Sequence, residues 1–274
     1  MRADLHLHTH FSDGKYSPQQ VVQKAAEAGL QRIAITDHDT VSGIAEARIA
    51  CLETNLECVS GVEISSEISD NEIHMLAYDF DPEYKPLLGL FELQRERRQQ
   101  RAIGFVGALR ESGVNIPPSD ELSLGEADKG TVGRPHIARL IVDAGSAASM
   151  DEAFAKYLVP GTSTFVPKSF PEVEDVLKLI EAAGGVSILA HPGHFTSHAD
   201  LLMLIDLGLN GVEVIHPSHD EVLQEYYGNL ANRFNLIATG GSDFHGWREG
   251  DEEKLGSYYT EWPSEGNLFH PRTL

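Results

Sequence analysis

Histidine and carboxylate residues gather at the ends of several short apolar segments of this 274-residue sequence. The first cluster is His6-Leu7-His8, and His6 and His8 lie two residues apart on an expected strand, so both imidazoles face the same side. Glu63 ends another apolar run, where a buried carboxylate is costly unless it is paired or bound to a metal ion. Nine residues of this kind are candidate metal ligands: His6, His8, Asp13, His38, Glu63, His74, His191, Asp243 and His245.

The apolar runs that carry these clusters predict a largely parallel β-sheet, because most of them lack the polar alternation of a one-sided antiparallel sheet. Helices are expected between the strands. Ser17-Pro18-x-Gln20 forms a capping box, and Ser169-Phe170-Pro171-Glu172 repeats the same device. We expect an α/β barrel whose strand ends collect the nine ligands at one rim. The expected strands are 2–8, 32–36, 57–64, 72–79, 185–190, 211–216 and 235–239.

The alternation of strand and helix stops in residues 81–165, which predict helices only. We therefore expect a helical insertion that caps a barrel domain formed by 1–80 and 166–274. The insertion is rich in basic residues, and two of them, Arg98 and Arg101, fall on one helical face that we expect to be exposed to solvent. The expected helices are 86–112, 134–144 and 149–158.

Composition excludes several classes of protein. The net charge is −21, from 21 basic and 42 acidic residues, which disfavours a protein that coats duplex DNA. It leaves open a small phosphorylated substrate or the end of a nucleic-acid strand. No apolar run suggests a membrane span, and the two cysteines suggest no disulfide framework, so we expect a cytoplasmic protein of undetermined oligomeric state.

The ordered set of motifs resembles the PHP family, named for polymerase and histidinol phosphatase. The motifs are the HxH pair, Thr36-Asp37-His38-Asp39, Gly61-Val62-Glu63, Ala190-His191-Pro192 and Ser242-Asp243-Phe244-His245. One carboxylate of the second motif, Asp37 or Asp39, would orient an imidazole. The resemblance implies a distorted seven-stranded (β/α) barrel with a centre of three divalent ions. The imidazole and carboxylate ligands suit Mn²⁺, which we expect first, with Zn²⁺, Fe²⁺ or Mg²⁺ as alternatives.

The resemblance also assigns the ligands to ions. One ion is expected at His6, His8, Glu63 and Asp243. Glu63 would bridge this ion to a second one at His74 and His191. The third ion is expected at Asp13, His38 and His245.

A further segment, Gly133-Arg134-Pro135-His136-Ile137-Ala138, resembles the signature of stand-alone PHP phosphoesterases. That subgroup acts on nucleoside 3′,5′-bisphosphates or on the 5′ ends of short RNA. Such a sequence opens a helix, where N–H groups and a guanidinium can bind one phosphate. Arg134 and His194 would assist catalysis, with His216 a further candidate near the rim. The substrate contacts that we expect are Arg134, His136, Lys168, His194 and His219.

The expected reaction is metal-dependent hydrolysis, in which water attacks phosphorus in line and His194 or a metal-bound water protonates the leaving group. A histidinol-phosphate phosphatase and a 3′→5′ exonuclease are the alternative enzymes. A non-catalytic module that binds nucleotides or metals is the alternative from another class. The complete ligand set favours an enzyme over that module.

Overall fold

The computed structural model describes residues 1–69, 71–117, 131–194, 196–247, 250–263 and 267–269. Residue contacts divide the chain into two compact units. The first is formed by Met1–Leu88 together with Phe170–Leu274, and the second by Gly89–Ser169.

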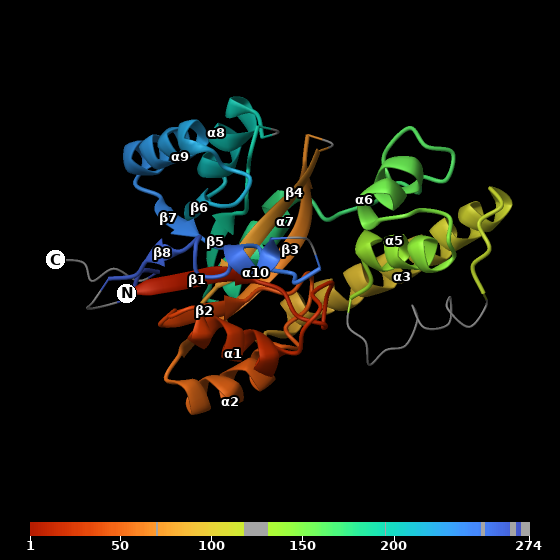
Figure 1. Ribbon diagram of the computed structural model, residues 1–274. Coiled ribbons are helices and arrows are strands. Elements are labelled where there is room, and N and C mark those ends of the chain that lie inside the picture. The colour runs from red at the N-terminus through yellow and green to blue at the C-terminus, as the bar shows by residue number, and fades with distance from the viewer. Residues whose placement is uncertain (70, 118–130, 195, 248–249, 264–266, 270–274) are drawn as a thin grey trace. The chain divides into compact units, whose positions relative to one another are not determined.

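The first unit is built on one eight-stranded sheet, nearly closed into a barrel (Figure 1). Its strand order is β7-β6-β5-β4-β3-β2-β1-β8. The predicted α/β barrel is confirmed, and all seven predicted strands are present. The eighth, β8 (Thr260–Glu261), was not predicted and pairs antiparallel with the first strand. The seven are β1 (Arg2–Leu7), β2 (Arg32–Ile35), β3 (Glu57–Ile68), β4 (Asn71–Tyr78), β5 (Val186–Leu189), β6 (Gly211–Ile215) and β7 (Ile237–Gly240).

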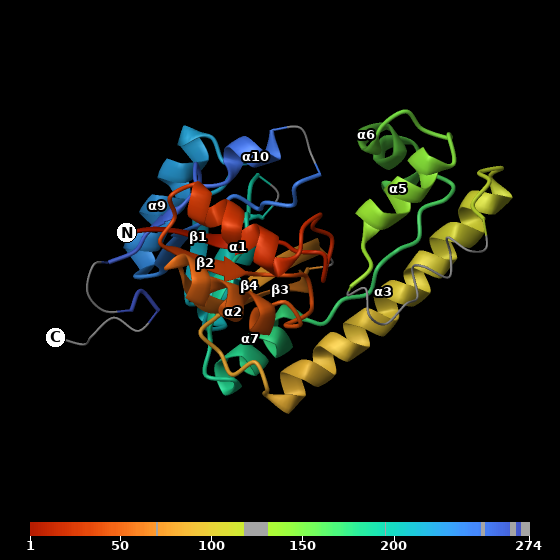
Figure 2. The same cartoon turned by 60° about the horizontal axis from the view of Figure 1, so that its bottom comes forward.

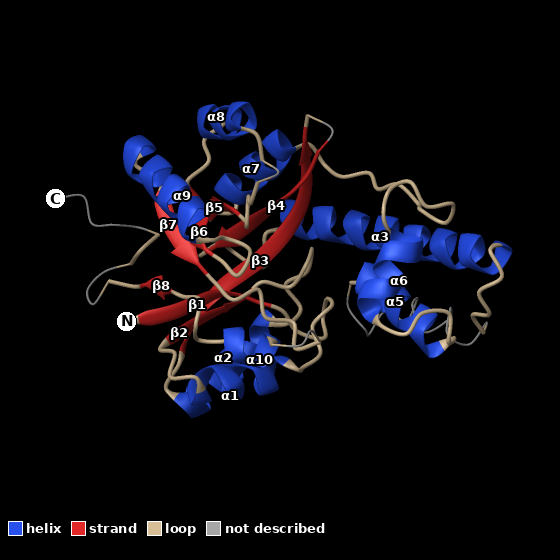
Figure 3. Ribbon diagram, turned by 45° about the horizontal axis from the view of Figure 1, so that its top comes forward, coloured by secondary structure: helices blue, strands red, loops and turns tan. Residues whose placement is uncertain are grey.

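The expectation of a mainly parallel sheet is wrong for β4, which runs antiparallel to both of its neighbours, β3 and β5. The two long strands β3 and β4 lie side by side in Figure 3. Only two residues separate Ile68 from Asn71, and a parallel pair requires a much longer crossover. The remaining neighbours among β1, β2, β3, β5, β6 and β7 pair in parallel.

Helix α1 (Pro18–Glu27) begins at the capping box that the sequence predicted. The Ser17 hydroxyl accepts a hydrogen bond from the Gln20 N–H at 3.2 Å, and the Gln20 side chain accepts one from the Ser17 N–H at 3.0 Å. This helix packs beside α2 (Ile44–Thr54), as Figure 2 shows. The other helices of the unit are α7 (Val173–Ala182), α8 (His198–Asp206), α9 (Glu221–Phe234) and α10 (Asp251–Lys254).

The second predicted capping box, at Ser169, is wrong. Helix α7 begins at Val173 with Glu172 as its N-cap residue, and no side chain caps it. The cause lies in the preceding residues, which pair with the end of β3. The Pro171 carbonyl accepts a hydrogen bond from the Glu67 N–H at 3.0 Å, and Glu172 forms a bridge with Glu67. Residues in that extended pairing cannot belong to the first turn of a helix.

The second unit has its own apolar core. It contains most of α3 (Lys85–Glu111), then α5 (Arg134–Asp143), α6 (Met150–Ala153) and a π-helix, η2 (Phe154–Leu158), so the three predicted helical stretches are confirmed. Phe105, Val106 and Leu109 of α3 pack against Ile137 and Ile141 of α5. Within the described part of the chain, no helix is both long enough and apolar enough to cross a bilayer.

Candidate metal centre

The structure brings the nine predicted ligands into one cluster in the first unit, with Glu63 of β3 at its centre. This side chain is fully buried and faces five imidazoles. Its Oε1 atom lies 2.7 Å from His74 Nδ1 and 2.9 Å from His191 Nε2. Its Oε2 atom lies within 3.3 Å of one nitrogen on each of His6, His8 and His38. The two oxygens of one carboxylate thus face two different groups of imidazoles.

Two further carboxylates complete the cluster. Asp243 Oδ1 lies 3.2 Å from His8 Nε2 and 3.5 Å from His6 Nε2. Asp13 Oδ1 lies 3.1 Å from His245 Nε2, and Asp13 Oδ2 lies 3.8 Å from His38 Nε2. Donor atoms close enough to share an ion fall into four overlapping groups. The groups are His6/His8/Asp243, His6/Glu63/His191, His38/Glu63/His74 and His8/Asp13/His38/His245.

The donor atoms of the cluster fit divalent cations. Several are buried and have no hydrogen-bond partner, although buried polar atoms are almost always paired. Imidazole and carboxylate without thiolate suit the harder divalent ions and differ from the cysteine-rich sets of structural zinc sites. The orphaned atoms are His6 Nε2, His8 Nε2, His38 Nδ1, Glu63 Oε2 and Asp13 Oδ1.

The imidazoles keep the carboxylates of the cluster ionised. Burial by itself would raise the pKa of Glu63, but the charges of His38 and His74 outweigh it and hold that pKa well below its usual value. Burial opposes the ionisation of Asp13 and Asp243 in the same way, and the charge of His245 does most to lower the pKa of each. The three carboxylates are therefore available as anionic ligands near neutral pH.

The segment after β7 approaches β1 closely enough to place Asp243 and His245 beside the HxH pair. Leu7 and Phe244 form a parallel bridge, and the His8 N–H donates to the Phe244 carbonyl at 3.0 Å. Gly241 permits this approach, since a Cβ atom there would lie 2.4 Å from the Cβ of His6.

Asp37 and Asp39 act on the backbone around the cluster. Asp37 Oδ1 accepts from the Thr9 N–H at 2.7 Å and from the Ser12 hydroxyl at 2.6 Å, while Oδ2 accepts from the Thr9 hydroxyl at 2.6 Å. It therefore holds the loop that leads to Asp13. Asp39 Oδ1 accepts a hydrogen bond from the Ser65 N–H at 2.9 Å, and Ser65 lies two residues after Glu63 on β3.

Sequence reasoning missed Glu213 of β6, which orients two of the predicted ligands. Its buried carboxylate lies 3.0 Å from His6 Nδ1 and accepts the backbone N–H of His191 at 2.8 Å. Burial opposes its ionisation, but the charges of His6 and His216 outweigh burial and lower the pKa of Glu213. An ionised carboxylate can only accept, so His6 Nδ1 donates to it, and Nε2 is the nitrogen that faces the cluster. Glu213 also ties down His191, whose φ of 25° is unusual for a residue other than glycine.

Two more histidines, both in the loop after β6, lie next to the cluster. His216 Nδ1 accepts from the Ser218 N–H at 3.0 Å, and its buried Nε2 lies 3.7 Å from Asp243 Oδ2. His219 has both ring nitrogens engaged with the backbone: Nδ1 donates to the Val214 carbonyl at 3.0 Å and Nε2 accepts from the Gly193 N–H at 3.1 Å. His219 therefore holds the loop that follows His191, and its predicted contact with substrate would require one of these bonds to be given up.

The remaining predicted substrate contacts are spread over both units. His194 is an exposed residue of the first unit, three positions after His191. Arg134, His136 and Lys168 belong to the second unit. There His136 Nδ1 accepts from the Gly133 N–H at 3.0 Å and so caps α5, and the Arg134 guanidinium lies over the Phe154 ring at 6.0 Å. Contact of these four residues with a substrate stays a prediction.

Comparison with known proteins decides the family. The model of the PHP domain matches residues 4–111. A 5′-3′ exoribonuclease of Haemophilus influenzae is 34% identical over 254 residues, which cover 90% of this chain and 92% of that protein. The chain belongs to the PHP family. A 3′,5′-nucleoside bisphosphate phosphatase of Chromobacterium violaceum is 32% identical over 255 residues, which cover 91% of this PHP chain and 89% of that protein.

A solved structure also resembles this PHP protein. A protein of Bifidobacterium adolescentis, described as a candidate metal-dependent phosphoesterase, superposes with a TM-score of 0.84 and 35% identity. The likeness covers 89% of this chain and 88% of the other. The predicted PHP fold is confirmed, and so is the prediction of a metal-dependent phosphoesterase, a hydrolase of phosphate esters.

Proposed function

We propose that this PHP protein removes the 3′-phosphate of nucleoside 3′,5′-bisphosphates, and that it also hydrolyses short 5′-phosphorylated RNA from the 5′ end. The observation that carries the proposal is Glu63, whose two oxygens face separate groups of imidazoles at 2.7–3.3 Å. Relatives that align over nearly the whole chain are named for these two activities. Both reactions cleave a phosphate ester of a nucleotide and require the same kind of centre.

The cluster would hold three divalent ions, Mn²⁺ in our proposal. His6, His8, Glu63 and Asp243 would hold the first ion, and Glu63 with His74 and His191 the second. Asp13, His38 and His245 would hold the third. The ions would supply a water molecule of lowered pKa and positive charge for the phosphate oxygens.

Charge balance explains why a phosphate is attracted to this part of an acidic protein. The nine ligands are six imidazoles and three carboxylates, so the neutral and anionic groups together contribute three negative charges. Three divalent ions contribute six positive charges, which leaves a net positive centre in a chain of net charge −21. A dianionic phosphate is therefore stabilised at the cluster and repelled by much of the remaining surface.

The chain's own residues would perform the remaining steps. Glu213 keeps His6 in the orientation in which Nε2 faces the cluster, and His219 holds the loop that bears His191. Exposed His194 would donate a proton to the leaving alkoxide oxygen as the P–O bond breaks. Arg134 would bind a phosphate oxygen through its guanidinium.

The test is product analysis with Mn²⁺-loaded protein and three substrates: adenosine 3′,5′-bisphosphate, a 5′-phosphorylated RNA pentamer and histidinol phosphate. We expect AMP and phosphate from the first, mononucleotides from the second and little turnover of the third. Turnover of histidinol phosphate alone would contradict the proposed substrate and leave the metal centre intact.

A pair of variants on one strand tests the site. Glu63→Gln should reduce kcat by at least about 100-fold, because the bridging carboxylate is lost from two groups of ligands. Glu67→Gln, the same change four residues along β3 and outside the cluster, should retain activity. Equal activity of the two variants would be inconsistent with catalysis at this cluster.

A further inference from the structure

His216 lies among the rings of the candidate metal centre but is not one of its nine proposed ligands. It follows β6 and is buried, with 6% of its surface exposed. Its ring centroid lies 5.1 Å from that of His191 and 6.1 Å from that of His6. A polar ring in this place can bind an ion, contact a substrate or support a neighbouring side chain. The contacts of its two nitrogens favour the last of these roles.

A tight turn fixes which nitrogen of His216 bears the proton. Nδ1 accepts a hydrogen bond from the Ser218 N–H at 3.0 Å, and the Ser218 hydroxyl lies 2.7 Å from the same atom. The His216 carbonyl accepts from the His219 N–H at 2.9 Å, which closes the turn. A backbone N–H can only donate, so Nδ1 has no proton and Nε2 bears one. In this tautomer Nε2 has no lone pair to offer an ion, so His216 is a hydrogen-bond donor toward the cluster and not a further ligand.

The Nε2 atom of His216 lies beside one oxygen of Asp243. The distance to Asp243 Oδ2 is 3.7 Å, longer than a hydrogen bond, and this buried Nε2 has no hydrogen-bond partner in the described part of the chain. The other oxygen, Oδ1, lies 3.2 Å from His8 Nε2 and 3.5 Å from His6 Nε2. Oδ1 is therefore placed to bind an ion together with the HxH pair, and Oδ2 is the outer oxygen. A buried donor without a partner is unfavourable, so attraction between this N–H and the outer oxygen stabilises both groups.

We propose that His216 is a positioning residue for Asp243: its Nε2–H attracts the outer carboxylate oxygen and so directs the inner one toward the ion shared with the HxH pair. The inference rests on the ion proposed at those ligands. A carboxylate that binds an ion through one oxygen can rotate unless its other oxygen is held, and residues that hold a ligand in this way typically contribute about 10–100-fold to metal affinity. Glu213 and His216 would thus support two ligands of the same ion, His6 and Asp243, from one segment of the chain.

Three substitutions separate the donor at Nε2 from the rest of the ring. His216→Asn removes that donor and keeps the turn, because an asparagine amide reaches the position of Nδ1 and its oxygen can accept from the Ser218 N–H. His216→Gln is the conservative variant, since a glutamine amide reaches the position of Nε2 and can donate there. His198→Asn is the matched control, because it makes the same change at an exposed residue of α8.

The readout is Mn²⁺ binding by the full-length protein, measured by competition with a chelator and by elemental analysis. We expect His216→Asn to weaken Mn²⁺ affinity by about tenfold or more, His216→Gln to recover most of that loss, and His198→Asn to bind as the wild type does. The kcat of His216→Asn should be low at limiting Mn²⁺ and rise toward the wild-type value as Mn²⁺ is added. A residue that contacts the substrate would not show this recovery.

Unchanged Mn²⁺ affinity in His216→Asn, or no recovery in His216→Gln, would overturn the role of His216. A raised KM with wild-type Mn²⁺ affinity would also overturn it and assign the residue to the substrate. Thermal unfolding after treatment with EDTA detects loss of the fold. If His216→Asn unfolds, His216→Phe takes its place, because it fills the space of the ring and lacks the donor. A wild type that holds Mn²⁺ but leaves adenosine 3′,5′-bisphosphate intact would contradict the proposed function, and the Mn²⁺ affinities of the variants would still decide this inference.

Discussion

Replacement of Glu213 should weaken metal binding, although this residue is not one of the proposed ligands. Its carboxylate accepts hydrogen bonds from His6 Nδ1 at 3.0 Å and from the His191 N–H at 2.8 Å. These contacts fix one imidazole and one backbone segment in two of the donor groups. The Glu213→Ala variant would remove both contacts and leave the buried His6 Nδ1 and the part-buried His191 N–H without an acceptor.

The expected magnitude follows from those two contacts. A hydrogen bond to a charged group contributes about 1.5–3 kcal/mol, and loss of a residue that orients a metal-binding imidazole typically reduces metal affinity about 10–100-fold. We expect Glu213→Ala to lie in that range. Glu213→Gln should have a smaller effect of about tenfold, because its amide oxygen can replace one carboxylate oxygen while its NH2 group, which cannot accept, replaces the other.

The assays are metal content by elemental analysis, Mn²⁺ affinity by competition with a chelator, and measurement of kcat and KM. Glu225→Gln, the same change on the exposed side of α9, is the matched control and should behave as the wild type does. Thermal unfolding of the EDTA-treated variants separates loss of the fold from loss of the ions. Unaltered Mn²⁺ affinity and kcat in Glu213→Ala would refute the role of Glu213 in orienting His6 and His191.

Two further changes test the structure around the cluster. Burial raises the pKa of Asp4 from 3.8 to about 7, so folding favours its protonated form, and its contribution to stability falls as the pH rises from about 4 to about 7. Asp4 Oδ1 accepts hydrogen bonds from the N–H groups of His6 and Ser242, and the amide oxygen of an Asp4→Asn variant can accept both. The Tm of this variant without metal should therefore exceed that of the wild type by several degrees at pH 8 and by much less at pH 5. A constant difference between the two pH values would contradict this account. Gly241→Ala should lower the free energy of unfolding by about 1–3 kcal/mol in urea, because its Cβ would overlap His6. Gly107→Ala on α3, where a Cβ meets open space, should show no loss, and equal losses would exclude steric overlap as the cause.

The sequence predicted the strands and the nine clustered residues because apolar runs mark strands and strand ends share one rim of a barrel. It could also have indicated Glu213, which lies between Val212 and Val214 on an apolar strand, as Glu63 lies at the end of one. The argument that a buried carboxylate requires a partner applies equally to both residues.

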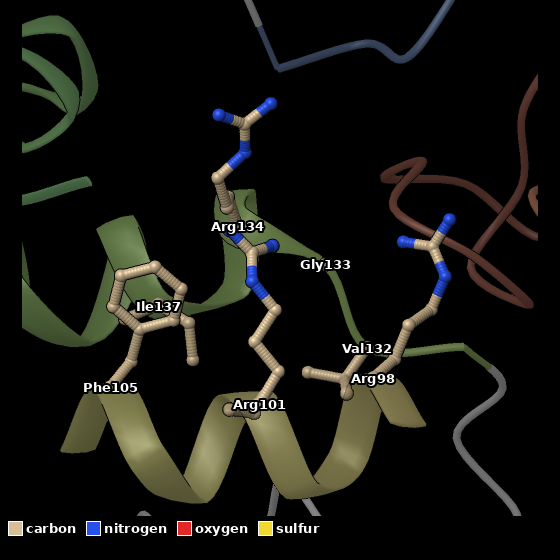
Figure 4. A pocket seen from close by; sticks show the side chains of 8 residues that line it. Arg98, Arg101, Phe105, Val132, Gly133, Arg134 and Ile137 are labelled. Carbon is tan, nitrogen blue, oxygen red and sulfur yellow. The ribbon is translucent and has the colours of Figure 1, made fainter. Parts of the chain in front are cut away.

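Other features depend on tertiary contacts that local patterns do not show. Ser169 resembles an N-cap, but pairing of Pro171 and Glu172 with β3 delays the helix to Val173. The pairing of β8 with β1 joins segments from the two ends of the chain. The packing of α3 against the start of α5, where Arg98, Arg101 and Arg134 line a small pocket (Figure 4), likewise cannot be predicted from helical periodicity alone.

The proximity of the two chain ends at the cluster bears on how this protein unfolds. Asp4 and Ser242 are joined by a hydrogen bond although they are 238 residues apart in sequence. Metal ions shared by the HxH pair and Asp243 would act as a reversible cross-link that closes a loop of nearly the whole chain. Closing so long a loop removes much conformational entropy from the unfolded state, so bound metal would make unfolding of the barrel more cooperative. Chelation would remove that cross-link, and the barrel would then be closed by the backbone pairing of β1 with β8 and of Leu7 with Phe244 alone.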